Sequence, residues 1–240
     1  MEYSKKFREF VERCKASGSP YMNLIGQGNP MSPILIVGQE PSGDACEFNS
    51  IEHWLYNLKD NRFDEYIRDR RTDDQKNWKA GSVWRNYQRL IECVFSPEHT
   101  YNPSPMFMDF ESRAFITEAS GIHCKSNRKA RLIPGKIEEI VLRKEQFFKD
   151  PFIQSFPVVI LACGNYFSKD EIAPLFCVMR DEKVREYSSN HVNHFSTHYN
   201  DDASKLVIHT RNLSNGVSKR MLEDMGRVIA EHLNKNNIRI

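Results

Sequence analysis

Four short runs of apolar residues along the chain predict buried strands. Two of them are almost wholly aliphatic and stop at Gly38 and Gly164, which is typical of strands covered on both faces. Residues 185–200 are more polar and predict a short strand or a loop. The four apolar runs are residues 33–37, 113–117, 157–162 and 205–208.

Apolar residues at helical spacing predict helices before, between and after these strands. A first helix ends near Gly18, and others cover residues 84–95, 134–149 and the chain from Ser218 onward. Residues 51–79 are polar and charged, with Trp54, Leu55 and Leu58 at helical spacing. We interpret that stretch as a helical insertion.

The alternation of strands and helices predicts an α/β fold. We expect a three-layer α/β/α sandwich with a central, mostly parallel four-stranded sheet, in a single domain spanning residues 1–240. In such sheets, chemistry gathers where the strands end at their carboxyl side. We therefore expect functional residues in four loops: residues 38–44, 118–131, 164–167 and 209–214.

Composition narrows the class of protein. The 34 basic and 32 acidic residues leave a net charge of +2, so a nucleic-acid surface would have to be a local basic patch. No apolar run approaches the ~20 residues of a membrane span, and the charged N-terminus lacks the apolar centre of a secretory signal. The six cysteines are scattered without a CxxC pair and indicate reduced thiols. We expect a cytoplasmic protein.

Short motifs give a more specific indication. Residues 26–30 (GQGNP) and 33–41 (PILIVGQEP), then 116–128 with Cys124 and finally 209–214 (HTRNLS), occur in this order at the predicted strand ends. Together they resemble the uracil-DNA glycosylase-like superfamily, and most closely its iron–sulfur (family 4) type. The resemblance covers most of the chain and leaves residues 51–79 outside it.

The resemblance implies a DNA glycosylase that hydrolyses the N-glycosidic bond of a flipped uracil or other modified base. Such an enzyme needs a carboxylate near C1′ to stabilise the sugar cation, and a donor for the departing base. Glu40 matches the first role and His209 the second. Gln39, Glu118 and Trp84 are the candidates for binding the base.

The same resemblance assigns contacts with DNA. Leu213 matches a leucine that wedges into the gap left by the flipped base, and Arg211 and Ser214 flank it. Between residues 124 and 136 five basic residues occur without an acid, and we expect phosphate contacts there. They are Lys125, Arg128, Lys129, Arg131 and Lys136.

Two departures from the family pattern change what is expected. Cys14 and Cys124 match two of four cluster ligands, but Ser17 stands where the partner of Cys14 belongs, so we expect no iron–sulfur cluster and no other cofactor. Glu118 replaces an asparagine that reads uracil. An ionised carboxylate only accepts hydrogen bonds, so Glu118 is predicted to disfavour uracil.

Simpler interpretations remain open. Glu40 could cap the next helix, His209 could be an ordinary polar histidine, Leu213 could belong to the core, and the basic run could be a solvated loop. The whole chain could be an inactive nucleic-acid-binding module. The string His191, His194 and His198 is interpreted as surface histidines and not as a metal site. We expect a monomer whose partner is DNA.

Overall fold

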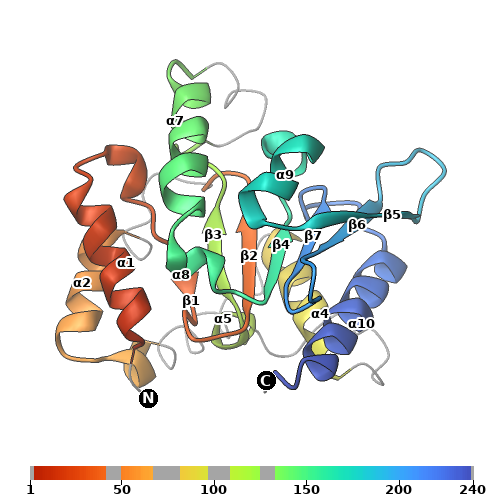
Figure 1. Cartoon of the computed structure of the whole chain (residues 1–240), viewed down its shortest axis with the longest axis horizontal. Coiled ribbons are helices and arrows are strands. Elements are labelled where there is room, and N and C mark those ends of the chain that lie inside the picture. The colour runs from red at the N-terminus through yellow and green to blue at the C-terminus, as the bar shows by residue number, and fades with distance from the viewer. Residues whose placement is uncertain (1–2, 42–49, 67–81, 97–108, 125–132, 239–240) are drawn as a thin grey trace.

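The computed structural model describes residues 3–41, 50–66, 82–96, 109–124 and 133–238. They form an α/β protein around one mixed sheet with the strand order β1-β3-β2-β4-β7-β6-β5 (Figure 1). The strands are β1 (Gln27–Gly28), β2 (Ile34–Gly38), β3 (Phe115–Glu118), β4 (Val158–Leu161), β5 (Met179–Glu186), β6 (His194–Tyr199) and β7 (Leu206–Thr210).

The four central strands are the four predicted from the apolar runs. β3, β2, β4 and β7 pair in parallel, and β2 and β4 are buried along their whole length. The predicted size of the sheet was wrong, because three antiparallel strands extend it to seven. β1 is too short to give a pattern, and β5 (MRDEKVRE) carries the charges that are common on edge strands.

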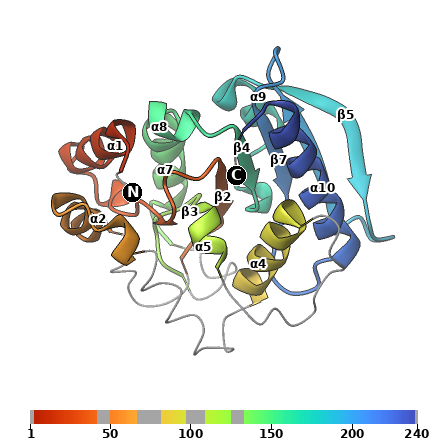
Figure 2. The same cartoon turned by 90° about the horizontal axis from the view of Figure 1, so that it is seen from below.

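Helices lie on both faces of the sheet (Figures 1 and 2). One core contains residues of α1, η3 and α9 together with Leu35 and Val37; the other contains residues of α4 and α10 together with Ile34 and Ile36. This alternation along β2 follows from successive side chains pointing to opposite faces. The helices are α1 (Lys5–Ala16), η1 (Pro20–Met22), α2 (Ile51–Lys59), α4 (Ser82–Phe95), α5 (Phe110–Arg113), α7 (Lys136–Leu142), η3 (Arg143–Phe148, a π-helix), α8 (Pro151–Gln154), η4 (Gly164–Tyr166), α9 (Lys169–Phe176) and α10 (Lys219–Lys235).

The helix α2 opens the stretch that the sequence analysis interprets as an insertion. Its Trp54 is fully buried, packs edge-on against Phe7 of α1, and donates its indole N–H to the Gly26 carbonyl at 2.7 Å. This part of the stretch therefore belongs to the main core. Residues 67–79 lie outside the described part of the chain.

The histidine string lies on the β5–β6 hairpin. His191 and His194 are at least partly exposed, as expected, but His198 is fully buried and its Nε2 lies 3.3 Å from Ser196 Oγ. Its assignment to the surface was wrong, because β6 is covered on both faces rather than lying at the edge of the sheet. Among the described helices, none is long and apolar enough to cross a membrane.

Candidate functional site

The carboxyl ends of β2 and β3 are held together beyond the last strand residues. Gly38 and Glu118 are partners in the parallel register. Three further backbone bonds then join the two loops: from Ala119 N to Gly38 O and from Ser120 N to Gln39 O, both 2.9 Å, and from Cys124 N to Pro41 O at 3.1 Å. These bonds fix the main chain on which Gln39 and Glu40 stand.

The side chain of Gln39 joins three of the four loops. Its Nε2 donates to the Cys163 carbonyl after β4 at 3.3 Å, and its Oε1 accepts from Asn212 Nδ2 after β7 at 2.8 Å. With both ends of the amide engaged, Gln39 serves in this structure as a clamp between strand ends. Its predicted contact with a base is not tested by this arrangement.

Glu40 has an enclosed carboxylate at this edge. Its side chain is 3% exposed, and Lys136 Nζ, itself buried, lies 3.4 Å from Oε2. The same Oε2 accepts the phenol O–H of Tyr166, while Oε1 is buried without a hydrogen-bond partner among the residues that the structure describes. Lys136 also lies 5.2 Å from the centre of the Tyr166 ring.

Glu118, the last residue of β3, interacts electrostatically with Glu40. Its carboxyl occupies the space over Gly38 that a side chain at that position would need, and its Oε2 is buried without a partner among the described residues. Burial and the neighbouring Glu40 charge raise the pKa of Glu118 to about 8, against an opposing effect of Arg143. Glu118 is therefore mainly protonated at neutral pH.

A buried arginine, Arg143, binds the backbone around Glu118. Arg143 donates to the carbonyls of Tyr21 (2.7 Å), Leu24 (3.2 Å) and Glu118 (3.0 Å). Its Nε lies 3.8 Å from Glu139, whose carboxylate accepts from Ser120 Oγ and Gly121 N in the loop after β3, both at 2.7 Å. The pair thus fixes the backbone of β3 and of the loop that follows it.

His209 lies at the same edge of the sheet, on β7, the strand that pairs with β4. Its backbone pairs with Leu161, and its Nε2 lies 2.9 Å from the Gly164 carbonyl. Gly164 and Tyr166 belong to the same helical turn, η4, so His209 contacts one end of that turn and Glu40 contacts the other. The sequence predicts that Glu40, His209 and Leu213 meet in one cleft at the carboxyl edge of the sheet. In the structure Glu40 and His209 lie at one edge with η4 between them, whereas Leu213 is buried in the core.

The residues after β7 that were assigned to DNA contact make contacts within the protein instead. Leu213 is fully buried among the core residues of α4 and α10, and Asn86 Nδ2 holds its carbonyl at 2.9 Å, so its packing favours the core interpretation over a wedge. Arg211 donates back to its own loop, to Asn212 O and Asn215 O, and Asn86 also binds the Ser214 carbonyl at 3.0 Å.

Trp84 is partly buried on α4, with its ring edge-on to Phe110 at 6.0 Å between centroids. That contact places it against the core on the α4 face, and stacking on a base stays a prediction.

The basic run gives one correction. Lys136 is 5% exposed and paired with Glu40, so its assignment to a phosphate was wrong; a buried ammonium finds its counter-ion inside the protein. Lys125, Arg128, Lys129 and Arg131 lie outside the described residues.

Three partners at the site were missed by sequence reasoning: Tyr166 and Asn212, and Lys136 as a partner of Glu40. Tyr166 follows the predicted third strand and lies in one of the four loops singled out, which was the available signal.

The cysteines do not suit an iron–sulfur cluster. Cys14 is buried in the core, where desolvation raises the pKa of its thiol to about 12, against the thiolate that a cluster needs. Ser17, at the partner position, donates its hydroxyl to the Cys14 carbonyl at 2.7 Å. Within the described part of the chain, no group of three or more His, Cys, Asp or Glu residues could hold a metal ion.

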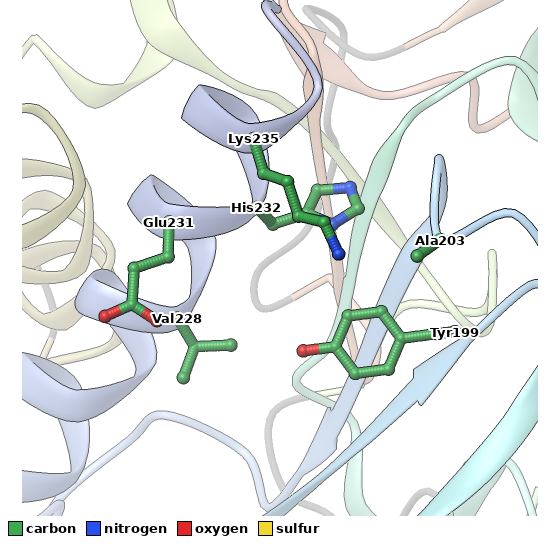
Figure 3. A pocket seen from close by; sticks show the side chains of 6 residues that line it. All are labelled: Tyr199, Ala203, Val228, Glu231, His232 and Lys235. Atoms are coloured by element: carbon green, nitrogen blue, oxygen red, sulfur yellow. The ribbon is translucent and has the colours of Figure 1, made fainter.

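Two cavities lie outside this site. One has a volume of about 280 Å³ and lies between β6 and α10, near the end of the sheet where the parallel strand β7 begins. Six residues line it (Figure 3): Tyr199, Ala203, Val228, Glu231, His232 and Lys235. The other is an open groove of about 800 Å³ between the β5–β6 hairpin and α10. It carries both signs of charge, from Arg185 and Arg220 and from Glu186 and Asp224, and by itself favours neither sign of ligand.

The chain matches no protein-family model, no curated protein and no solved structure.

Proposed function

We propose that this protein is a monofunctional DNA glycosylase that hydrolyses the N-glycosidic bond of a flipped base. The observation that carries the proposal is Glu40: a buried carboxylate held at one oxygen by Lys136 and Tyr166, whose other oxygen has no partner among the described residues, where four parallel strands end. A carboxylate in a dry site stabilises a positive charge far better than one in water.

In the proposed reaction the bond between C1′ and the base nitrogen breaks, and its electron pair leaves with the base. The sugar cation that develops at C1′ is stabilised by Glu40 Oε1. Water then adds its hydroxyl to C1′, and its remaining proton ends on the departed base. The products are a free base and an abasic site, and no other reactant is needed.

The second catalytic residue of the proposal, His209, contributes differently. Because its Nε2 lies 2.9 Å from the Gly164 carbonyl, donating to a base would require that bond to open. We assign it to the base side of the site together with Glu118 and Gln39. The basic residues Lys125, Arg128 and Lys129 would hold the DNA phosphates, with Arg211 and Ser214 beside them.

The test is direct. The purified chain is incubated with single- and double-stranded oligonucleotides that carry uracil, hypoxanthine and other modified bases, and abasic sites are counted by alkaline strand cleavage. Glu40→Gln should lower the rate by roughly 10²–10⁴-fold. The matched control is Glu145→Gln, since Glu145 is 58% exposed and pairs only with Lys149 among described residues. If no base in the panel is released, the proposal fails.

A second candidate is an inactive module of the same kind that binds nucleic acid without cleaving it. Two observations favour it: Leu213 is fully buried, and the His209 ring is engaged with Gly164. The two candidates separate in one experiment, because a binding module would retain the oligonucleotides with a steep salt dependence and release no base. Reversing the charges of Lys125, Arg128 and Lys129 should weaken retention in either case.

A further inference from the structure

The end of β3 places a carboxyl group at the carboxyl edge of the sheet, beside the loops that end the neighbouring strands. Glu118 is the last residue of β3 and the register partner of Gly38, whose missing side chain makes room for the Glu118 carboxyl. The residue keeps some contact with solvent, while its Oε2 is buried and has no hydrogen-bond partner in the described part of the chain. A buried polar atom without a partner is costly and indicates a group that a ligand would satisfy.

The groups around Glu118 oppose its ionisation. Burial is the larger effect, and the Glu40 charge, in the loop after β2, adds to it in raising the pKa of Glu118. Tyr87 of α4 and Cys163 after β4 are also electrostatically close to Glu118, and burial raises the pKa of both groups, so both are neutral. The cation that opposes this effect, Arg143, donates to the Glu118 backbone carbonyl at 3.0 Å. Among the described residues, no salt bridge joins the Glu118 carboxyl to a basic side chain.

A neutral carboxylic acid has chemistry that a carboxylate lacks. It presents one O–H donor beside one C=O acceptor, whereas the ionised form presents acceptors only. A base with adjacent C=O and N–H groups, such as uracil or hypoxanthine, matches the neutral acid with two hydrogen bonds. The same base meets repulsion between its carbonyl and an ionised carboxylate.

We propose that Glu118 reads the base as a neutral carboxylic acid, donating its O–H to a carbonyl oxygen and accepting from the adjacent ring N–H. This rests on the proposed function, and it reverses the sequence-based expectation that Glu118 disfavours uracil. The donated hydrogen bond also strengthens when the bond to the sugar breaks, because negative charge then develops on that carbonyl. Glu118 thereby sets specificity for bases with a C=O/N–H edge.

The experiment measures binding separately from cleavage. The probe is a labelled single-stranded oligonucleotide with one 2′-fluoro-2′-deoxyuridine, whose electron-withdrawing fluorine prevents loss of the base. Its affinity is compared with that of the same strand carrying 2′-deoxyadenosine at this position, at about pH 6 and about pH 9. At one pH unit above its pKa, about a tenth of an acid is still neutral. The ratio of the affinities for the uridine and adenosine probes should therefore be roughly tenfold lower at pH 9 than at pH 6 for the parent protein.

The variants separate the possible causes. Glu118→Gln keeps a donor and an acceptor but cannot ionise, so it should retain the preference at both pH values. Ionisation of uracil itself would affect parent and Glu118→Gln alike, and is thereby subtracted. Glu118→Ala should lose the preference at both pH values, with Glu145→Gln as the control. Circular dichroism checks that each variant is folded.

Two results overturn the inference: a parent preference independent of pH, or one that Glu118→Ala leaves intact. A protein that binds as expected but releases no uracil from ordinary deoxyuridine keeps the inference and refutes only the proposed hydrolysis.

Discussion

The Glu118 carboxyl lies directly over Gly38, its register partner on the neighbouring strand. Because Gly38 has no side chain, the Glu118 carboxyl can occupy the space over β2, where burial and the Glu40 charge raise its pKa. The guanidinium of Arg143 donates instead to backbone carbonyls, including that of Glu118.

Replacement of Gly38 by alanine should disturb this contact. A Cβ there would collide with the Glu118 carboxyl, so we expect a loss of about 1–3 kcal/mol in the free energy of unfolding, measured by urea denaturation. The double variant Gly38→Ala/Glu118→Ala removes the colliding group and should recover much of that loss relative to Glu118→Ala. Equal losses with and without Glu118 would show that another contact is responsible.

The raised pKa of Glu118 predicts a pH-dependent stability. In the folded protein the group holds its proton up to about pH 8, whereas in the unfolded chain it releases it near the ordinary glutamate pKa of 4.5. The folded state thus binds more protons between these values, and its stability should fall as pH rises from about 4.5 to 8. Since Glu118 keeps some solvent contact, the change should be on the order of 2 kcal/mol.

Glu118→Gln should remove this contribution to the slope, and the difference between parent and variant isolates it from other titrating groups. The measurement is the free energy of unfolding in urea at several pH values. Parallel curves for the two proteins across this window would contradict a protonated Glu118.

The Arg143 guanidinium should be among the most important side chains for folding. Arg143→Met leaves the carbonyls of Tyr21, Leu24 and Glu118 without their donor and the buried Glu139 without its cation. We expect a loss of roughly 3–5 kcal/mol in the free energy of unfolding. Arg13→Met is the comparison, because Arg13 pairs with Asp150 but is 46% exposed on its side chain, and it should cost less. Similar losses for the two variants would contradict the special role of Arg143.

Leu213 provides a test between core and wedge. Because its side chain is fully buried, Leu213→Ala should lower the free energy of unfolding by about 2–5 kcal/mol. The control is Val192→Ala, since Val192 is 42% exposed on the β5–β6 hairpin and should cost little. A wedge would give the converse result, namely weaker binding to an oligonucleotide with unchanged stability.

The sequence by itself determined the central architecture. Buried parallel strands need nearly continuous apolar runs, so β2 and β4 were visible as ILIVG and VVIL, and α10 was visible from its helical period. The order of the motifs also predicted which strand ends would meet, and Glu40 and His209 do lie at one edge, joined through η4.

Only the tertiary structure decided what surrounds each site residue. Lys136, 96 positions from Glu40 along the chain, becomes its buried counter-ion, and Leu213 becomes core, because packing rather than local pattern sets burial. The charge of Glu118 was decided in the same way. Its type predicted an ionised acceptor, but burial next to Glu40 raises its pKa, since a second negative charge in a poorly solvated site is unfavourable.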